Sequence, residues 1–494
     1  MNTNRIQKIG VVGGGTAGLV AALILKTKFE NISVDIIRSE KIGTIGVGEG
    51  STEHWLDFME FIGIDHRTLV RETDASFKSG IMFQDWGKKD FLQSIGDVFN
   101  IDEDRYPIVY ANLIANGAEP KDLVSSLSWN SQSNIWFVGK DDQSQVNQYH
   151  FNTHKLNDFL IRCCTERGIT VIDDEINSVK LDVDGIRSLK GEKSNYKYDF
   201  YIDSTGFKKL LISKLGAKWQ SYSEYLSMNS AIVFPLENHE EIPMWTLSKA
   251  MSSGWAFRIP VWGRYGNGYI FDNNYISNEE AKLEIEQYLE TEVEVKKVIN
   301  FDPGRVDKAW IKNCCAIGLS ASFVEPLEAS SIGTSIQQSF LLTESLINYN
   351  NRVIDRYNKA VEDVLDNIRD FICLHYLTNR ADSKFWQDQQ HRPIPDRLKD
   401  QLEIWSHKMP TSTDFSDLSD KILFSELHYI LILHGLDKFN TDSIKREYET
   451  MFSKDKKDEI ERIIKDYNNL TYSTVGHKTM LEFLRDIKNY PHDI

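Results

Sequence analysis

The pattern of apolar positions is clearest near the start of the chain, where it predicts a strand, a helix and a second strand. Residues 8–13 form a short apolar run closed by glycine, which is typical of a buried strand. Ala17 to Phe29 has the small and leucine-like residues of a buried helix, and Ile32 to Ile37 is again strand-like. This order predicts a βαβ unit and the start of a doubly wound α/β fold.

Further along, the pattern changes from strands to helices. Strands are predicted at Lys197–Ile202 and Ala231–Leu236, and from about residue 335 onward the pattern is mostly helical. Two long amphipathic helices are predicted at Ser335–Asn348 and Thr413–His434. We therefore expect an interleaved body over residues 1–350, with insertions around 90–150 and 210–300, and a helical region over 351–494.

Composition places the chain among ordinary globular proteins. Of 494 residues, 41% are hydrophobic and 26% are charged, and 57 Lys plus Arg against 73 Asp plus Glu give a formal net charge of −16. Such an acidic surface repels phosphate and anionic lipid, so neither nucleic acid nor a membrane is an expected partner. No apolar run reaches roughly 18 residues, so no transmembrane helix is expected.

The cysteines point to a reducing compartment. Cys163 and Cys164 are adjacent, as are Cys314 and Cys315, and Cys373 stands alone. None has the C-x-x-C spacing of a metal or redox motif, so we expect neither a disulfide framework nor a metal site. The first residues lead directly into a strand without a signal-peptide pattern, which favours the cytoplasm.

A glycine turn follows the first predicted strand. Residues 13–18 read Gly-Gly-Gly-Thr-Ala-Gly and fit G-x-G-x-x-G between a strand and a helix. In this motif the first glycine makes the turn, the second lets backbone approach a pyrophosphate, and the third lets helix and strand pack closely. We predict dinucleotide contacts at Gly13, Gly15, Thr16, Ala17 and Gly18.

The end of the second strand differs from the usual pattern. A ribose-binding acid is expected about 20 residues after the glycines, but Arg38 occupies that place and Glu40 follows two residues later. Both are candidate cofactor contacts. Arg38 also leaves open a second interpretation, in which an arginine accommodates the 2′-phosphate of NADP.

Two further turns are candidates for cofactor binding. Residues 45–52 are dense in glycine and contain Gly48, Glu49 and Ser51, which suit a loop that closes over a ligand. The strand pattern at 199–203 ends in Asp203, followed by Ser-Thr-Gly206. Taken alone, each of these segments could equally be a plain turn.

Two distant segments each place an ionisable side chain among apolar or small residues. Lys78 lies between Phe77 and Ser79-Gly80, and Glu328 ends the run Phe-Val-Glu-Pro-Leu-Glu. Taken alone, a lysine is usually a solvated surface residue, and Glu325 or Glu328 could cap the following helix. Trp255 could likewise be an ordinary core residue.

Taken together and in order, these motifs make the chain resemble the flavin-dependent halogenases of the tryptophan-halogenase type over most of residues 8–390. The matching stretches are Gly13–Gly18, Gly46–Glu49, Phe77–Ile81 with Phe83 and Trp86, Asp203–Phe207, Gly254–Pro260, Gly304-Arg305, Trp310–Leu319, Glu325–Glu328, Asp370–Ile372 and His375-Tyr376. An ordered set of this length is far more specific than a glycine turn alone.

Three departures distinguish this chain from that pattern. The family signature W-x-W-x-I-P has Phe257 in place of its second tryptophan. The stretch Phe91–Phe99 lacks the histidine that tryptophan-specific members place near their substrate, and Ala-Ser-Ser-Ile follows Glu328 where Ser-Thr-Gly or Ser-Thr-Ser is usual. These departures favour a substrate-divergent member of the family.

The resemblance implies a doubly wound FAD-binding fold of the flavin monooxygenase type with a mostly helical C-terminal region. It also implies a reaction in which reduced FAD, supplied by a separate flavin reductase, works with O₂ and a halide to give hypohalous acid. This oxidant then halogenates an electron-rich aromatic substrate, indole-like or phenolic. Body 1–350 would carry FAD and the catalytic groups, and region 351–494 would lie on the substrate side.

The resemblance also assigns roles to particular residues. Lys78 would hold the oxidant or form a haloamine, and burial among apolar side chains would lower its pKa. Glu328 would orient the oxidant or act as general base. The remaining implied sites are halide-binding amides at Ser330 and Ser331, a passage wall of Trp255, Phe257, Ile259 and Pro260, and further cofactor contacts at Gly318 and Ile332.

Two other functions fit parts of the sequence. A flavin-dependent aromatic monooxygenase would share the glycine turns but would have no use for Lys78. A non-catalytic flavin- or nucleotide-binding protein would need neither Lys78 nor Glu328. The sequence does not specify the substrate, the halide (chloride, bromide or iodide), the regiochemistry or whether the chain forms a homo-oligomer.

Overall fold

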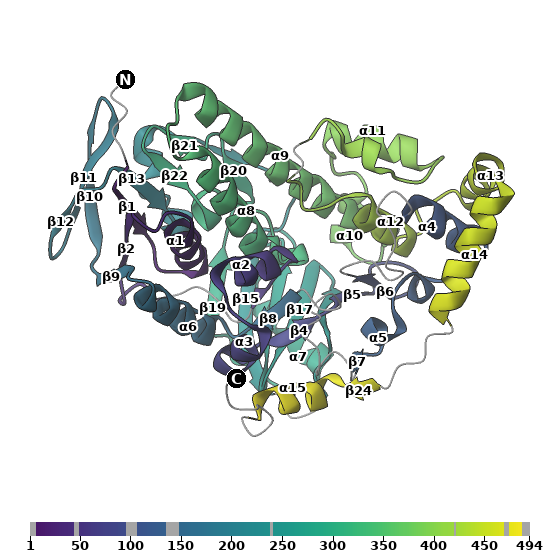
Figure 1. The fold of residues 1–494 in the computed structure, drawn as a ribbon. Helices are drawn as coiled ribbons and strands as arrows, with labels where there is room; N and C mark the ends of the chain where they lie inside the picture. Colours follow the sequence, from purple (N-terminus) through teal and green to yellow (C-terminus); the bar gives the residue numbers. More distant parts are fainter. Residues whose placement is uncertain are drawn as a thin grey trace. The chain divides into compact units, whose positions relative to one another are not determined.

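The computed structural model describes residues 6–43, 49–94, 106–134, 148–237, 241–418, 421–468 and 474–486 (Figure 1). The chain forms two compact units, each assembled from three segments. Unit 1 comprises Met1–Ala75, Phe151–Ser223 and Asp302–Asp366, and unit 2 comprises Ser76–His150, Glu224–Phe301 and Asn367–Ile494.

Unit 1 contains a six-stranded sheet in the order β21-β22-β13-β1-β2-β9. All neighbouring strands pair in parallel except the edge strand β21, which is antiparallel to β22. The strands are β1 (Lys8–Val12), β2 (Ser33–Arg38), β9 (Thr170–Asp173), β13 (Phe200–Asp203), β21 (Trp310–Ile311) and β22 (Cys314–Ala316). The apolar residues of β1, β2, β13 and β22 are buried, as expected for parallel strands covered by helices, whereas the edge strand β9 is half-buried to exposed.

Helices accompany this sheet within unit 1. Helix α1 (Thr16–Lys28) is buried over most of its length, because it contacts both α6 and α8. The other helices of unit 1 are α2 (His54–Ile62), α3 (His66–Thr73), α6 (Thr153–Glu166), α8 (Ser330–Ser345), and the short 3₁₀ turns η4 (Gly206–Lys208), η5 (Ile212–Leu215), η6 (Gly318–Ser320) and η7 (Pro326–Glu328). Helix α9 (Asn351–His375) contains the boundary between the units at residue 366.

Small sheets complete unit 1. One comprises β10 (Ile176–Asp182), β11 (Gly185–Gly191) and β12 (Asn195–Tyr196). Another comprises β14 (Trp219–Ser221), β20 (Gly304–Val306) and β23 (Ser322–Phe323), and the two-residue strand β3 is Glu49–Gly50.

Unit 2 is built on a seven-stranded sheet in the order β19-β15-β18-β17-β16-β5-β6. Only the pair β16 and β5 is parallel. The strands are β5 (Gly80–Gln84), β6 (Phe91–Ser94), β15 (Ser230–Glu237), β16 (Trp245–Ala250), β17 (Gly254–Val261), β18 (Arg264–Phe271) and β19 (Lys297–Asn300).

The two faces of this sheet carry different side chains. Ala256 on β17 pairs with Tyr269 on β18, and both join a buried cluster that includes Ala281 of helix α7 (Asn278–Leu289). Because side chains alternate along a strand, Trp255 and Phe257 belong to the opposite face. We call this second face the aromatic face of the sheet.

The remaining elements of unit 2 are mostly helical. They are β4 (Ser76–Lys78), β7 (Gln132–Asn134), β8 (Gln148–Phe151), β24 (Thr474–Gly476), α4 (Tyr106–Ala115), η2 (Pro120–Leu123), α5 (Ser126–Trp129), α10 (Lys384–Gln389), α11 (Asp396–Trp405), η8 (Ser412–Phe415), α12 (Glu426–Gly435), α13 (Thr441–Met451), α14 (Lys454–Asn468) and α15 (His477–Arg485).

The predicted βαβ start is confirmed within one or two residues, and the strand predicted at Ala231–Leu236 is β15. The strand predicted at Lys197 begins later, at Phe200. The single long helix predicted at Thr413–His434 is wrong, because Ser425 caps a new helix by exchanging hydrogen bonds with the third residue of α12. The helix predicted from Ser335 begins earlier, at Ser330.

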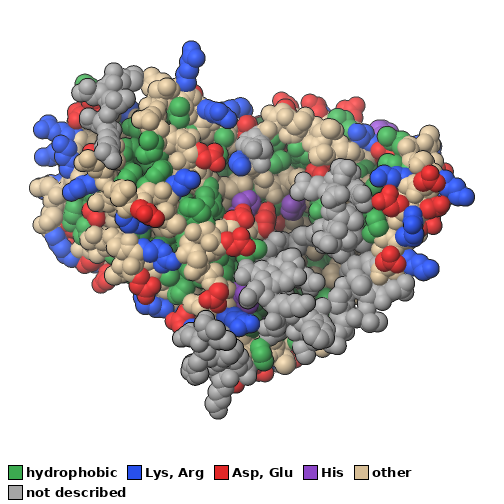
Figure 2. Space-filling model, viewed as in Figure 1, with side chains coloured by type: hydrophobic (Ala, Val, Ile, Leu, Met, Phe, Trp, Pro, Cys, Tyr) green, Lys and Arg blue, Asp and Glu red, His purple; other side chains and the backbone are tan. Residues whose placement is uncertain are grey.

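The five cysteines are free thiols and all are buried. Within the described ranges, no group of three or more His, Cys, Asp or Glu side chains is arranged to hold a metal ion. No helix in this part of the chain is long and apolar enough to cross a membrane. On the face drawn in Figure 2, acidic and basic side chains are interspersed.

Candidate active site

The glycine turn connects β1 to α1 in unit 1 and approaches β13. Gly13 has a φ of +117°, and a Cβ there would lie 2.1 Å from the Ser204 carbonyl oxygen. A Cβ on Gly18 would lie 2.2 Å from the Gly13 carbonyl oxygen and 2.4 Å from the Ser204 hydroxyl. These two glycines are therefore required by close packing of the turn.

Gly15 has a different environment. A Cβ added to it would meet no atom within 4 Å. Its φ of −79° and ψ of 175° are accessible to any residue. The glycine is thus not required by the protein itself, which suits a position where backbone lies against a ligand.

The turn opens into a cavity of about 340 Å³ inside unit 1. Its described lining residues come from β1, α1, β2, the end of β13, the segment before β10 and the start of α8. Among the predicted cofactor residues, the cavity is lined by Gly13, Gly15, Thr16, Ala17, Arg38, Glu49, Gly206 and Ile332. Gly18, Glu40, Ser51, Asp203 and Gly318 are not among the described lining residues, and Gly48 lies outside the described part of the chain.

At the end of β2, Arg38 faces the cavity and Glu40 does not. The Arg38 side chain covers Gly14, where a Cβ would lie 2.6 Å from the Arg38 Cβ. Its guanidinium lies 3.5 Å from the exposed carboxylate of Glu40. An arginine therefore occupies the position at which an acid usually contacts the ribose.

Glu49 brings a carboxyl group into the cavity. The hydroxyl of Thr16 donates to Glu49 Oε2 at 3.2 Å. Burial raises the pKa of Glu49 to about 7, and this hydrogen bond partly opposes the rise. Near neutral pH the side chain therefore exists in both protonation states.

Asp203 organises the turn that follows β13. Its carboxylate accepts hydrogen bonds from the Thr205 amide at 3.0 Å, the Leu211 amide at 2.7 Å and the Ile212 amide at 2.8 Å. The Ser320 hydroxyl, near Gly318, donates to the same carboxylate at 3.1 Å. This side chain fixes the backbone that carries Gly206 to the cavity.

The N-terminus of α8 borders the same cavity. Ser331 and Ile332 line it, while Ser330 is buried at the first helical position. The helix approaches residues 51–52 closely, since a Cβ on Gly333 would lie 2.1 Å from the Thr52 hydroxyl. The first amides of a helix have no acceptor within the helix and carry its positive dipole end, so this position suits an anion.

These features fit the pyrophosphate and adenosine portions of FAD. The backbone is exposed at Gly15, the helix dipole of α1 begins at Thr16, and the cavity extends along β2 to Arg38. Gly13, Gly15, Thr16 and Arg38 are the residues that would hold the nucleotide.

Lys78 lies in β4 of unit 2 and only 2% of its surface is exposed. Strand β4 pairs antiparallel with β8, and Lys78 lies opposite Gln148. The ammonium nitrogen donates to Gln148 Oε1 at 3.0 Å. A lysine buried to this degree is rare and requires polar partners, so its position is not that of a solvated surface residue.

Two buried histidines lie close to this lysine. Burial and the neighbouring Lys78 charge hold the pKa of His150 well below its usual range. The His150 Nε2 atom lies 2.9 Å from the Thr246 hydroxyl on β16. Burial also lowers the pKa of His477 to about 4. Both imidazoles are therefore neutral at physiological pH.

Glu328 lies at the end of η7 in unit 1 and is buried, as is Glu325. The residue at the N-cap of α8 is Ala329, with a φ of 51°, and no side chain caps the helix there. Glu328 is therefore not the cap of α8. Lys78 and Glu328 belong to different units, and their convergence stays a prediction.

The four predicted wall residues lie on β17 of unit 2. Trp255 and Phe257 have ring centroids 6.1 Å apart, and Ile259 follows them on the aromatic face. The Phe257 ring covers Gly268, where a Cβ would lie 2.4 Å from the ring. By the same alternation Pro260 points to the other face, while its carbonyl oxygen accepts from the Ser76 hydroxyl at 2.5 Å.

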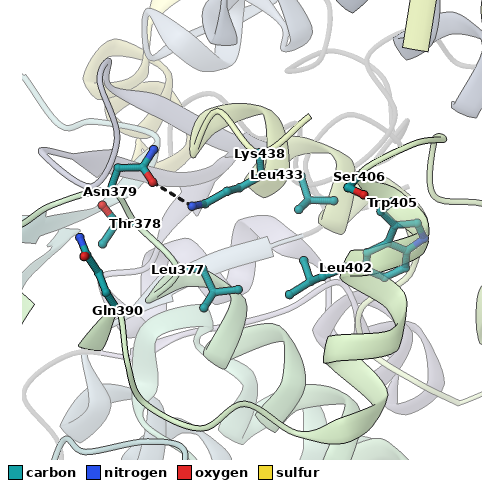
Figure 3. A pocket seen from close by; sticks show the side chains of 9 residues that line it. All are labelled: Leu377, Thr378, Asn379, Gln390, Leu402, Trp405, Ser406, Leu433 and Lys438. Atoms are coloured by element: carbon teal, nitrogen blue, oxygen red, sulfur yellow. Dashed lines mark hydrogen bonds between the residues drawn. The ribbon is translucent and has the colours of Figure 1, made fainter. Parts of the chain in front are cut away.

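Unit 2 also contains a larger cavity of about 510 Å³ (Figure 3). Trp405, Leu377, Leu402 and Leu433 give it an apolar side, and Lys438 donates to Asn379 Oδ1 at 3.0 Å within it. None of the residues predicted from the sequence line this cavity. The smaller cavity of unit 1 is the better candidate for the cofactor site, because the glycine turn and the N-terminus of α8 both border it.

Several polar neighbours of these sites were not found from the sequence. Gln148 and Thr246 are ordinary residues whose partners are distant in the chain, and no local motif marks them. Glu175 lies two residues after the end of β9 and lines the cavity of unit 1. An acidic residue just after a strand is the sequence signal that could have indicated it. No local motif distinguishes His150 from the other histidines of the chain, because its partner Thr246 is 96 residues away.

The parallel sheet, the glycine turn and the cavity at the carboxyl ends of its strands define a dinucleotide-binding α/β enzyme of the flavoprotein type. Comparison with known proteins identifies the family. The family model for tryptophan halogenase matches residues 8–450. The chain therefore belongs to the tryptophan halogenase family and is a flavin-dependent halogenase, an oxidoreductase that acts on an aromatic substrate.

Individual relatives agree with this assignment. Tryptophan 6-halogenase SttH of Streptomyces toxytricini is 32% identical over 83% of this chain and 86% of its own length. Tryptophan 7-halogenase RebH of Lentzea aerocolonigenes is 28% identical over 84% of each chain. The crystal structure of tryptophan halogenase from Shewanella frigidimarina superposes with a TM-score of 0.91 at 25% identity and covers 99% of both chains.

Proposed function

We propose that this enzyme halogenates an electron-rich aromatic carbon of an indole-like or phenolic substrate with hypohalous acid held by Lys78. The observation that carries the proposal is the burial of Lys78, with its nitrogen 3.0 Å from Gln148 Oε1. Strand β4, which carries Lys78, pairs with β8, and His150 of β8 hydrogen-bonds to Thr246 of β16. Thr246 lies on the same face of the sheet as Phe257, because Ser248, two residues later, pairs with Phe257. Strand β4 therefore lies over the aromatic face. A buried amine among aromatic side chains suits the binding of a small neutral oxidant.

The overall chemistry balances in two steps. FAD, when bound and reduced, supplies the two electrons that activate O₂. Halide, O₂, FADH₂ and one proton then yield hypohalous acid, water and FAD. In the second step a ring C–H bond is replaced by carbon–halogen, and the hypohalous oxygen leaves as water.

Halide binding is proposed at the N-terminus of α8. Ser330 and Ser331 are the first two residues of this 16-residue helix, and their amides are directed outward from its positive end. Ser331 lines the cavity proposed for FAD. Backbone donors suit chloride, bromide or iodide alike, because they select charge more than size.

Glu328 is proposed as the general base that takes the ring proton in the second step. It is buried, and a carboxylate is a common general base in enzymes. Lys78 would donate a hydrogen bond to the hypohalous oxygen and so assist its departure. Trp255, Phe257 and Ile259 would form a dry boundary that keeps water away from the oxidant.

Cofactor contacts are proposed at the predicted set of residues. The cavity of unit 1 supports eight of these contacts, because it is lined by Gly13, Gly15, Thr16, Ala17, Arg38, Glu49, Gly206 and Ile332. Gly18, Asp203 and Gly318 are not among its described lining residues, but they pack against or hydrogen-bond to residues beside it. Glu40 and Ser51 stay proposals without that support.

We propose a separate flavin reductase as the source of reduced FAD and the cytoplasm as the location. Buried, free cysteines are consistent with a reducing compartment. The named relatives act on tryptophan, whereas Phe257 and the Ala-Ser-Ser sequence after Glu328 favour a different aromatic substrate here. The division into body 1–350 and region 351–494 also stays a proposal.

The test supplies the enzyme with a flavin reductase, NADH, FAD and each halide in turn, together with a panel of indoles and phenols. Mass spectrometry should detect a halogenated product whose mass follows the halide added, and no product when halide is omitted. Hydroxylated products without halogen would support a monooxygenase instead. Bound FAD with no turnover of any aromatic would support a non-catalytic flavoprotein.

A further inference from the structure

The C-terminal segment 474–486 reaches β4 (Ser76–Lys78) of unit 2, which we call the lysine strand. Strand β24 pairs antiparallel with β7, with Thr474 opposite Asn134 and Gly476 opposite Gln132 (Figure 1). Helix α15 begins immediately afterwards, at His477, which is fully buried. The family model ends at residue 450, so this segment lies outside the matched region.

Both nitrogen atoms of His477 have backbone partners. Nδ1 lies 3.0 Å from the Ile242 carbonyl oxygen, and Nε2 lies 3.1 Å from the Phe77 amide nitrogen. A neutral imidazole has one donor and one acceptor, so the proton is on Nδ1 and Nε2 accepts from Phe77. The contacts select this single tautomer.

Phe77 precedes Lys78 in β4 and lies opposite Tyr149 of β8. Its amide points to the His477 imidazole, on the side of the strand where a further strand would otherwise provide an acceptor. The Phe77 ring lies 6.0 Å from the imidazole and 5.5 Å from the Tyr149 ring. His477 therefore occupies the open edge of the lysine strand.

The residues on either side of this contact are also fixed. The Ser76 hydroxyl donates to the Pro260 carbonyl oxygen at 2.5 Å and lies 3.2 Å from His150 Nδ1. The Ser79 amide donates to the Met244 carbonyl oxygen at 2.5 Å. Between these two anchors, the contact from His477 holds the backbone on which the Lys78 side chain depends.

We propose that His477 is a positioning residue for Lys78, acting through its hydrogen bond with the Phe77 amide. This inference rests on the proposed role of Lys78 in halogenation. It assigns to the C-terminal segment a part in the reaction of this enzyme. Loss of the acceptor at His477 removes this hydrogen bond from the buried Phe77 amide, and the lysine strand then shifts or opens locally.

The test compares His477→Leu and His477→Phe, which lack the acceptor, with His477→Gln, whose amide oxygen restores it. His434→Leu is the matched control, because that histidine also contacts a backbone carbonyl of unit 2, at 3.1 Å from Ala118. Each variant is measured for hydrogen exchange of the peptide that spans Phe77 to Gly80, for kcat and KM of halogenation, and for hypohalous acid trapped by an added thioether.

We expect the Leu and Phe variants to exchange the Phe77 amide at least tenfold faster and to lose roughly tenfold or more in kcat. KM for the aromatic should stay within about twofold. The fraction of oxidant trapped by the thioether should rise, because the oxidant is still made but not held. His477→Gln should recover most of the loss, and His434→Leu should match the parent protein in exchange and in product.

Unchanged exchange at Phe77, or an unchanged ratio of product to trapped oxidant in both variants, would overturn the positioning role. If His477→Phe does not fold, the same measurements are made on His477→Leu, whose side chain is smaller. If the parent enzyme itself makes no halogenated product, the proposed function fails, and the exchange measurement still decides whether His477 holds the lysine strand.

Discussion

Single residues in this protein are placed in environments that change their acid–base behaviour. Glu49 is the clearest case in unit 1, since burial raises its pKa to about 7 beside the Thr16 hydroxyl. In unit 2, burial lowers the pKa of His477 to about 4, because burial disfavours the charged form of an imidazole. Both shifts arise from the same desolvation, and each affects stability in a different pH range.

The first prediction concerns Glu49→Gln. The folded protein binds a proton at Glu49 more tightly than the unfolded chain, so its contribution to stability is complete below about pH 4.5 and is lost as pH rises through about 7. The variant should therefore be more stable than the parent by about 3 kcal/mol at pH 8 and by less than about 1 kcal/mol at pH 5. Urea unfolding at pH 5 and pH 8 measures the difference in unfolding free energy between variant and parent. The same difference at both pH values would contradict the prediction. Glu40→Gln, at an exposed acid, is the control.

At the scale of elements, the first βαβ unit was predicted well because its signals are local. The glycine turn, the strand before it and the helix after it are contiguous, so burial pattern and turn chemistry agree. The helix predicted over Thr413–His434 failed because Ser425 begins a new helix with its own cap. The environment of Lys78 could not be predicted, since Gln148 and His477 are 70 and 400 residues away from their partners in β4.

The second prediction separates two glycines of the same turn. Gly15→Ala should leave stability within about 0.5 kcal/mol, because no atom lies near the added Cβ, but should weaken FAD binding at least tenfold. Gly18→Ala should destabilise the protein by about 1–3 kcal/mol, because its Cβ would lie 2.2 Å from the Gly13 carbonyl oxygen. Urea unfolding and titration of flavin fluorescence report the two effects separately. Gly15→Ala with parental FAD affinity would contradict the assignment of the cavity.

At the scale of the whole molecule, the chain passes repeatedly between the nucleotide-binding unit and the unit that carries Lys78. Buried histidines in unit 2 make its stability sensitive to acid. The unfolded chain protonates His477 near its ordinary pKa of 6.5, while the folded protein does so only at about 4. Its contribution to stability is therefore present above about pH 6.5 and is lost as pH falls toward 4.

The third prediction concerns the loss of stability as the pH falls. Between pH 6.5 and 4 the parent should lose up to about 1.4 kcal/mol per pH unit through His477, and His477→Gln should remove that part of the slope. His407→Gln, at an exposed histidine, is the control for the substitution itself. Unfolding free energies from urea titrations at intervals of half a pH unit supply the comparison. An identical slope in the parent and His477→Gln would show that the buried imidazole does not titrate as described.

The most direct test of the central claim, that Lys78 holds the oxidant for attack on the aromatic substrate, is the product balance of Lys78→Met. The enzyme is supplied with reductase, FAD, NADH, bromide and an accepted aromatic, and both brominated product and thioether-trapped hypobromous acid are measured. We predict that brominated product falls by at least a factor of about 100 while trapped oxidant continues to form. Bromination at the parental rate in Lys78→Met would contradict the account.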